Sequence, residues 1–353
     1  MPIASSLLNK PRLVKKLRDF YDYVNKNDGQ VGTKTRGIDL NFNNACNLRC
    51  KYCFTNSPKG DHVKEYLDIG AIKRLADEAD ELGYFEFDLQ GGELLLQPKK
   101  LFEVLEAIKP ERFYMYLTTH GYYLDESMAK KLAEYKVSRV SVSIDSMDEK
   151  IHDEIRGRKE SWKRAIAALE HVKNAGMDPY LNITVGHYNA NTGHFKELLD
   201  YSKNKKYRTL LNVAVPSGMW QNAEGIICDD KDREYLRKIR KDYKNLVRNI
   251  WNPFDKNHEK ILGCTTVNRV YITPIGDVLV CPYVHIKIGN IFEQSLKEII
   301  DHGFSIKYFK SHSNLCLAGE DKEFISKFMT KSGQSIFKPA LAKDIFNKED
   351  FVD

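Results

Sequence analysis

The sequence has 353 residues, of which 42% are hydrophobic, and a formal net charge of +6. This composition allows one large folded core, with or without a second small one. No run of about eighteen apolar residues occurs, and the first residues do not join a basic segment to a long apolar one. We therefore expect a cytoplasmic protein with no membrane partner.

The positive charge is concentrated in residues 231–248, which hold eight basic and three acidic residues. The solvent-exposed face of a helix is the simpler interpretation, and a patch that attracts a phosphorylated or acidic substrate is the alternative. Aromatic residues do not alternate with these basic ones, and no nucleic-acid-binding motif occurs. We therefore expect no nucleic-acid partner.

Strand patterns and helix patterns alternate along the first two thirds of the chain. The expected strands are residues 38–42, 85–89, 113–118, 138–144, 180–185 and 210–215. The expected helices between them are residues 68–82, 99–108, 126–135, 161–175 and 192–203. This alternation predicts an α/β fold with a parallel sheet. Right-handed crossovers curl such a sheet, and six units are fewer than a closed barrel needs, so we expect a partial (β/α)6 barrel.

The pattern changes after Pro216. A polar helix is expected over residues 230–250, then a β-hairpin whose strands, residues 270–273 and 278–280, flank a turn at 274–277, then a helix over 295–302. The expected units are an N-terminal helical extension (1–36), the partial barrel (37–225), a helical linker (226–259), a small hairpin-plus-helix domain (260–320) and a C-terminal helix or tail (321–353).

Three of the seven cysteines lie close together after the first expected strand, at Cys46, Cys50 and Cys53. Grouped cysteines in a cytosolic chain indicate metal binding rather than disulfides. Structural zinc sites take four ligands, often as two close pairs, and no fourth Cys or His lies nearby. Three thiolates favour an iron–sulfur cluster that keeps one iron free of protein ligands.

The spacing C-x3-C-x2-C, with Tyr52 before the third cysteine, resembles the signature of the radical S-adenosylmethionine (radical SAM) superfamily. The resemblance implies a [4Fe-4S] cluster whose open iron binds S-adenosylmethionine. It also implies one electron from a flavodoxin- or ferredoxin-type donor, a 5′-deoxyadenosyl radical, and removal of a hydrogen atom from a substrate.

Further motifs follow the expected strands, where parallel α/β folds place their chemistry. Gly91, Gly92 and Glu93 resemble the superfamily's Gly-Gly-Glu motif, which contacts the methionine amino group. A Gly-rich turn between a strand and a helix is the alternative. His120 stands where the family has Asn in a Thr-Asn-Gly turn, so we expect it to be structural.

The fourth and fifth strands end in side chains suited to hydroxyl and carboxylate groups. By resemblance, Ser143 and Arg156 should hold the methionine carboxylate, because an Arg fork matches a carboxylate, and Asp145 should lie near the ribose or the substrate. Asn182 and Val185 should contact ribose and adenine.

A second set of cysteines, Cys264, Cys281 and Cys316, lies in the C-terminal quarter. Buried structural cysteines are the simpler interpretation. The pattern C-x11-G-x4-C, which ends at Cys281, resembles the start of the SPASM and twitch domains, and the absence of the longer cysteine run favours the twitch form. The resemblance implies an auxiliary [4Fe-4S] cluster. Three cysteines leave its fourth position to Cys228, to a residue such as His312 or Asp321, or to none.

Cys228 has three interpretations: an inert thiol, a ligand of the auxiliary cluster, or a donor of a hydrogen atom to a substrate radical. The segment before the first expected strand is shorter than the leader-binding domain of many peptide-modifying relatives. We therefore expect a small polar substrate, sugar-like or aminocyclitol-like, that is dehydrogenated, deoxygenated or epimerised. A peptide maturase is the second hypothesis, and a non-catalytic electron carrier is the third.

Overall fold

The computed structural model describes residues 10–59, 66–223, 225–255, 257–333 and 335–352. Its strands form a single sheet in the order β11-β10-β9-β8-β1-β2-β3-β4-β5-β6-β7. They are β1 Gly37–Asn41, β2 Glu86–Gln90, β3 Tyr114–Thr119, β4 Arg139–Ser143, β5 Asp178–Val185, β6 Arg208–Val213, β7 Leu246–Val247, β8 Arg269–Ile272, β9 Asp277–Cys281, β10 Val284–Asn290 and β11 Ala340–Leu341.

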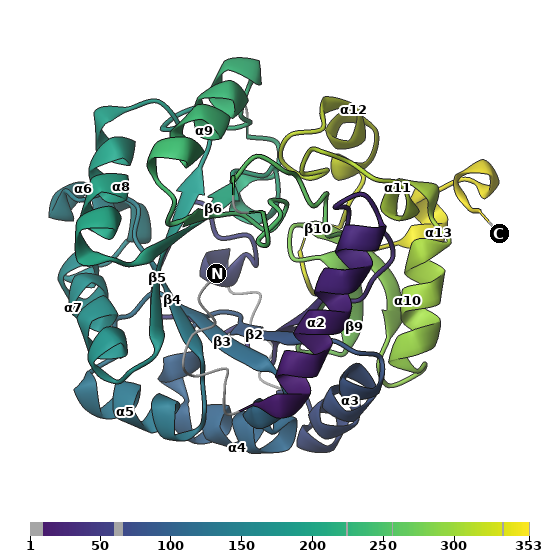
Figure 1. Cartoon of the computed structure of the whole chain (residues 1–353), viewed down its shortest axis with the longest axis horizontal. Helices are drawn as coiled ribbons and strands as arrows, with labels where there is room; N and C mark the ends of the chain where they lie inside the picture. Colours follow the sequence, from purple (N-terminus) through teal and green to yellow (C-terminus); the bar gives the residue numbers. More distant parts are fainter. Residues whose placement is uncertain (1–9, 60–65, 224, 256, 334, 353) are drawn as a thin grey trace.

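The strands from β1 to β7 are all parallel and run in chain order. The sheet curves without closing, and helices lie along its outer side (Figure 1). The predicted partial α/β barrel is therefore confirmed. The six expected strands appear as β1 to β6, and each starts and ends within two residues of its expected bounds.

The helices are α2 Pro11–Lys26, α3 Ile69–Glu81, α4 Pro98–Ile108, α5 Glu126–Glu134, α6 Glu149–Arg156, α7 Ser161–Asn174, α8 Gly193–Lys205, α9 Asp230–Asp242, α10 Leu296–Phe304, α11 Lys307–Lys310, α12 Lys322–Phe324 and α13 Ala342–Ile345. Side-chain caps fix several starts: Asp68 accepts from the N–H of Ala71 before α3, and Thr192 accepts from that of Phe195 before α8. Helix α6 lies outside the helices expected from the sequence. Asp148 caps its start, and Gly157, at a φ of 67°, ends it.

Side chains alternate along the barrel strands between the inside and the outside of the curved sheet. Polar side chains face inward and line a cavity: Asp39, Asp88, Gln90, Tyr116, Thr118, Arg139, Ser143, Asn182, Thr184 and Asn212. Apolar side chains between them join the buried core: Ile38, Leu40, Phe87, Leu89, Leu117, Val140, Val142, Leu181, Ile183 and Val185. The core therefore lies between sheet and helices, and the barrel interior is free to bind polar groups.

The C-terminal hairpin continues the barrel sheet at its β1 edge. Strand β8 pairs with β1 in parallel, and β9 pairs with β8 in antiparallel fashion across the predicted turn. Gly276 sits in that turn at a φ of 80°, a conformation that favours glycine. One sheet therefore runs through both the expected barrel and the expected hairpin domain.

The basic stretch of residues 231–248 is only partly helical and only partly exposed. Helix α9 ends at Asp242, because Tyr243 and Leu246 turn into the core and the chain pairs with β6 as β7. Lys238 and Lys241 are exposed, as a solvated helix face requires. Arg240 and Arg248, in contrast, are 2% and 9% exposed.

Helix α2 covers the barrel end opposite the strand carboxyl ends. Phe20 packs with Phe85, just before β2. The Lys10 ammonium group donates to the carbonyl groups of Pro110, Phe113 and Lys136 at 2.9–3.0 Å. Burial lowers the pKa of Lys10 to about 8. None of the helices in the described residues is long and apolar enough to span a bilayer.

Candidate functional site

The first cysteine set lies on a loop that follows β1. Cys46, Cys50 and Cys53 are half-buried free thiols, and all three line the cavity inside the barrel. The backbone N–H groups of Arg49 and Lys51 donate to the carbonyl oxygens of Arg156 and Ile155 at 2.9 and 3.1 Å. The end of α6 therefore holds the middle of this cysteine loop.

The two glycines after β2 lie directly beneath the start of the loop. The N–H of Gly92 donates to the carbonyl of Asn43 at 3.1 Å. A Cβ at Gly92 would lie 2.1 Å from the carbonyl oxygen of Ala45, and one at Gly91 would lie 2.5 Å from that of Asn43. Only glycine permits this close approach of two backbones.

The thiols of the first set fit an iron–sulfur cluster. Burial, followed by the negative charges of Glu93, Cys50 and Cys53, raises the pKa of Cys46 to about 12. Burial also raises the pKa of Cys50, and Cys53 contributes to that rise. These thiols lie close enough together for the negative charge of one to disfavour ionisation of the others. A bound cationic metal centre removes this penalty by deprotonating the thiols that coordinate it, so the three cysteines suit such a centre.

Arg156 and Asp145 form a buried pair beside Cys50. Arg156 donates to Asp145 from Nε at 2.6 Å and from Nη2 at 3.2 Å, and its Nη1 lies 3.7 Å from the Cys50 sulfur. The Tyr52 hydroxyl also donates to Asp145. Tyr52 and Arg156 line the cavity, as does Ser143, whereas Asp145 is not among the lining residues. Asp145 therefore orients two cavity residues.

The second cysteine set faces the same cavity. Cys264, Cys281 and Cys316 are half-buried and line it together with the first set. Burial, followed by the charge of Cys264, raises the pKa of Cys281 to about 12. Burial and the charges of Cys264, Glu320 and Cys281 raise the pKa of Cys316 well above its usual range. These three thiols also form a clustered donor set that suits an iron–sulfur cluster.

None of the three expected fourth ligands lines the cavity. Cys228 is fully buried, with its sulfur 3.9 Å from the carbonyl oxygen of Val185. His312 Nε2 lies 2.9 Å from the side-chain oxygen of Asn314. Asp321 caps α12 by accepting from the N–H of Phe324.

Glu93 and Val185, two of the expected S-adenosylmethionine contacts, are not among the residues that line the cavity. Glu93 is 1% exposed, and its carboxylate accepts from the Thr119 hydroxyl at 2.7 Å and from the N–H of His120 at 3.1 Å. Val185 belongs to the core between sheet and helices. Gly91, Gly92 and Asn182 do line the cavity.

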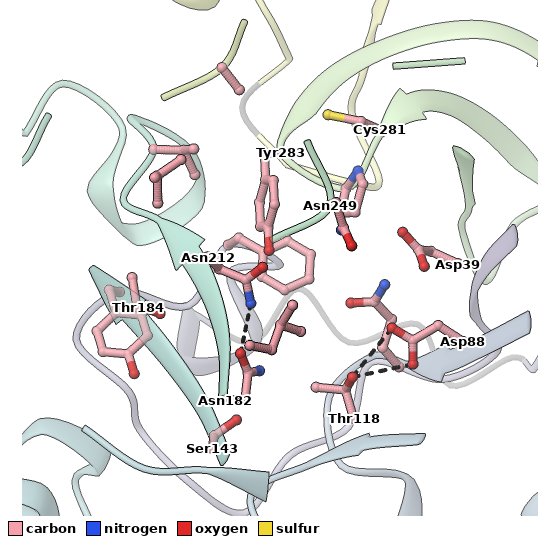
Figure 2. A pocket seen from close by; sticks show the side chains of 18 of the residues that line it. Asp39, Asp88, Thr118, Ser143, Asn182, Thr184, Asn212, Asn249, Cys281 and Tyr283 are labelled. Carbon is pink, nitrogen blue, oxygen red and sulfur yellow. Dashed lines mark hydrogen bonds between the residues drawn. The ribbon is translucent and has the colours of Figure 1, made fainter. Parts of the chain in front are cut away.

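Polar side chains form one part of the wall of the cavity that both cysteine sets line, and apolar side chains such as Leu210, Val213 and Trp220 form another. Figure 2 shows Asp88 and Thr118 on one side and Asn182 and Asn212 on the other, with Cys281 beyond them. The Thr118 hydroxyl donates to Asp88 at 3.2 Å, and the Asn212 amide donates to Asn182 at 2.7 Å. Amide and hydroxyl groups are thus available on the wall of the cavity that both sets of thiols line.

Charged residues at the base of the cavity were missed by sequence reasoning. Arg269 donates to Asp39 from Nε at 2.9 Å and to Glu86 from Nη1 at 2.8 Å. Burial and the Asp39 carboxylate raise the pKa of Asp88 well above its usual range. The available signal was a charged residue between apolar neighbours in a predicted strand, as in the Ile-Asp-Leu of β1 and the Phe-Asp-Leu of β2.

Comparisons with known proteins agree with this arrangement. A family model for the Radical SAM superfamily matches residues 40–202, and one for an iron-sulfur cluster-binding domain, SPASM, matches residues 264–318. GTP 3′,8-cyclase of Nautilia profundicola is 27% identical, over 74% of this chain and 89% of its own length. AdoMet-dependent heme synthase of Methanosarcina barkeri is 26% identical, over 72% and 78%. The subtilosin biosynthesis protein AlbA of Bacillus subtilis is 24% identical, over 72% of this chain and 57% of its own length.

Two solved structures show the same fold. The structure of anSMEcpe with bound AdoMet and the Cp18Cys peptide has a TM-score of 0.60 and 20% identity, and the match covers 82% of this chain and 91% of that one. Streptococcus suis SuiB bound to precursor peptide SuiA has a TM-score of 0.60 and 17% identity, over 83% and 69%. With its partial barrel, its cysteine sets and both family matches, the chain belongs to the radical SAM superfamily and carries a SPASM domain.

Proposed function

We propose that this radical SAM enzyme removes a hydrogen atom from a small, hydroxyl-bearing polar substrate held between its two cysteine sets. Cys46, Cys50 and Cys53 would hold the cluster that binds S-adenosylmethionine, and Cys264, Cys281 and Cys316 the auxiliary cluster. The first cluster, when bound and reduced, supplies the electron that cleaves S-adenosylmethionine to methionine and a 5′-deoxyadenosyl radical.

One observation carries the choice of substrate: polar side chains on the cavity wall have unused hydrogen-bonding capacity. Within the described residues, the structure gives no hydrogen bond to the side chains of Ser143, Thr184, Asn249 or Tyr283, and all four line the cavity (Figure 2). Polar groups that face a cavity without a partner are satisfied by water or by a ligand. A ligand rich in hydroxyl groups matches these amide and hydroxyl groups.

The residues near the first cysteine set would position S-adenosylmethionine. Gly91 and Gly92 bring backbone close to Cys46, and Ser143 and Asn182 offer a hydroxyl and an amide at strand ends. Arg156 lies against Cys50 and is oriented by Asp145, so its remaining N–H capacity would serve a carboxylate at the edge of the loop. Glu93 would act indirectly, by fixing Thr119 and the turn that follows β3.

The auxiliary site would keep one position free of protein ligands. Three cysteines line the cavity there, and Cys228, His312 and Asp321 do not. We propose that substrate groups reach this position, opposite the first cysteine set. Cys228 would then be a packing residue, because its thiol lies outside the cavity wall.

Peptide modification is the second candidate function. AlbA is named for bacteriocin biosynthesis, and SuiB and anSMEcpe were solved with peptides bound. A peptide side chain with a hydroxyl or amide group would match the same cavity wall. This candidate rests on likeness to proteins of low sequence identity, whereas the first rests on the cavity itself.

The two candidate functions can be separated by treating a cell extract before the assay, because protease destroys a peptide substrate and periodate destroys a substrate with vicinal diols. The test measures 5′-deoxyadenosine formation by the reconstituted enzyme with the low-mass fraction of cells that carry the gene. We expect stimulation that survives protease treatment and is lost after periodate oxidation, which cleaves vicinal diols. Loss after protease treatment would favour a peptide, and survival of both treatments would contradict a hydroxyl-rich substrate.

The cavity wall supplies the matched variants. Asn249→Ala should weaken this stimulation, because Asn249 faces the cavity with a free amide. Asn245→Ala is the control, since the Asn245 amide already donates to Ser202 at 3.1 Å and to the carbonyl of Tyr207 at 3.0 Å. Equal effects of the two substitutions would contradict the assignment of the cavity wall.

A further inference from the structure

A buried ion pair joins the barrel to the loop that carries Cys316. Arg248, directly after β7, donates to Glu320 from Nη1 at 3.1 Å and from Nη2 at 2.9 Å. The two side chains are 7% and 2% exposed. Two parallel bonds between a guanidinium and a carboxylate fix both groups in position.

The same carboxylate also closes the Cys316 loop. Glu320 accepts from the N–H of Cys316 at 2.9 Å, and its own N–H donates to the carbonyl of Cys316 at 2.8 Å. Gly319 presses this loop onto the end of β6, because a Cβ there would lie 2.7 Å from a methyl group of Val213. Glu320 therefore links the position of Cys316 to the barrel wall.

The second cysteine set takes its members from both edges of the open barrel. Cys281 ends β9, which reaches the β1 edge through β8. Cys316 is attached through Glu320 to Arg248, beside the β6–β7 edge. Arg248 lines the same cavity as the second set, and its positive charge acts on the Cys316 thiol by lowering the pKa of that group against the effect of burial.

We propose that Arg248 and Glu320 are positioning residues for the auxiliary iron–sulfur cluster, which hold Cys316 at the cavity wall and balance the charge that sets the cluster's reduction potential. This inference rests on the proposed assignment of Cys264, Cys281 and Cys316 to that cluster. Nearby charges act strongly at a buried site, and they are among the factors that set iron–sulfur potentials.

The two members of the pair have opposite effects on reduction. Reduction adds one negative charge to the cluster, which the Arg248 guanidinium favours and the Glu320 carboxylate disfavours. Arg248→Gln should therefore lower the potential, and Glu320→Gln should raise it. The double variant keeps hydrogen-bonding groups at both positions and removes both charges, so its potential should return toward that of the unmodified pair.

The test isolates the auxiliary site. In a background in which Cys46, Cys50 and Cys53 are all replaced by alanine, the full chain is reconstituted with iron and sulfide and titrated potentiometrically at one pH, with the reduced cluster detected by electron paramagnetic resonance. We expect each single variant to change the equilibrium constant of reduction at least about tenfold, or about 59 mV for one electron. Lys241→Gln is the control, because this exposed cation on α9 is screened by solvent.

The outcomes separate charge balance from simple scaffolding. Opposite shifts in the two single variants, or loss of iron from the single variants but not from the double one, would support the proposal. Unchanged potentials, shifts in the same direction, or loss of iron from the double variant as well would overturn it. If the background holds no cluster, the assignment of the second cysteine set fails, and the inference fails with it.

Discussion

Replacing Gly92 with alanine tests how closely the first cysteine loop lies on the connection after β2. A Cβ at this position would lie 2.1 Å from the carbonyl oxygen of Ala45 and 2.5 Å from the carbonyl carbon of Asn44, whereas ordinary contacts begin at 3.4 Å. The obstructing atoms are backbone, so they cannot rotate away. The chain just before Cys46 must therefore shift by roughly 1 Å to accept the methyl group.

The shift has two measurable consequences. Overpacking of this kind costs about 1–3 kcal/mol of the free energy of unfolding. A catalytic group displaced by about 1 Å loses about 100-fold in rate. We therefore expect Gly92→Ala to reduce 5′-deoxyadenosine formation about 100-fold, while the overall fold is retained.

The assay is anaerobic reconstitution with iron and sulfide, followed by dithionite and S-adenosylmethionine, with 5′-deoxyadenosine and bound iron both quantified. Gly193→Ala is the matched control, because no atom lies within 4 Å of a Cβ at that position, which begins α8. Unimpaired product formation by Gly92→Ala, or an equal loss in Gly193→Ala, would refute the steric argument.

Three further predictions follow from the cavity and the core. Cys281→Ala should reduce bound iron from about eight to about four per chain, and unchanged iron would rule out a cluster at the second cysteine set. Arg269→Gln should lower the free energy of unfolding by about 3–5 kcal/mol, because Asp39 and Glu86 lose a buried cation; a urea titration that shows less than about 1 kcal/mol would contradict this. Burial lowers the pKa of His285 to about 4, below the value of about 6.5 expected when it is unfolded, so the unfolded chain binds the proton first as pH falls. Between pH 7 and pH 5 this group should therefore remove up to about 2 kcal/mol of stability, a loss that His285→Gln should lack if the mechanism is correct.

The fold was largely predictable because its signals are local. Each barrel strand alternates polar and apolar side chains or is rich in β-branched ones, and the strand that ends at Ser143 shows both features. The three closely spaced cysteines were found by their spacing, and Gly91–Gly92 by their resemblance to the superfamily's Gly-Gly-Glu motif. The structure brings these motifs together at the carboxyl ends of parallel strands, where the topology requires them to be.

The parts that sequence reasoning missed depend on contacts between distant segments. The pairing of Arg248 with Glu320 joins residues 72 positions apart, and that of Arg269 with Asp39 joins residues 230 apart. Strand β7 has two residues, too few for any periodic signal. Glu93 belongs to a motif, and the sequence did not reveal that the Thr119 hydroxyl and two backbone N–H groups bind its carboxylate.

The most direct test of the account is whether Cys50 is needed for cleavage of S-adenosylmethionine. Wild-type protein and Cys50→Ala are reconstituted anaerobically, reduced with dithionite and supplied with S-adenosylmethionine, and 5′-deoxyadenosine is quantified. We expect the wild type to form 5′-deoxyadenosine and Cys50→Ala to form none above background. Equal amounts from both proteins, or none from the wild type, would contradict it.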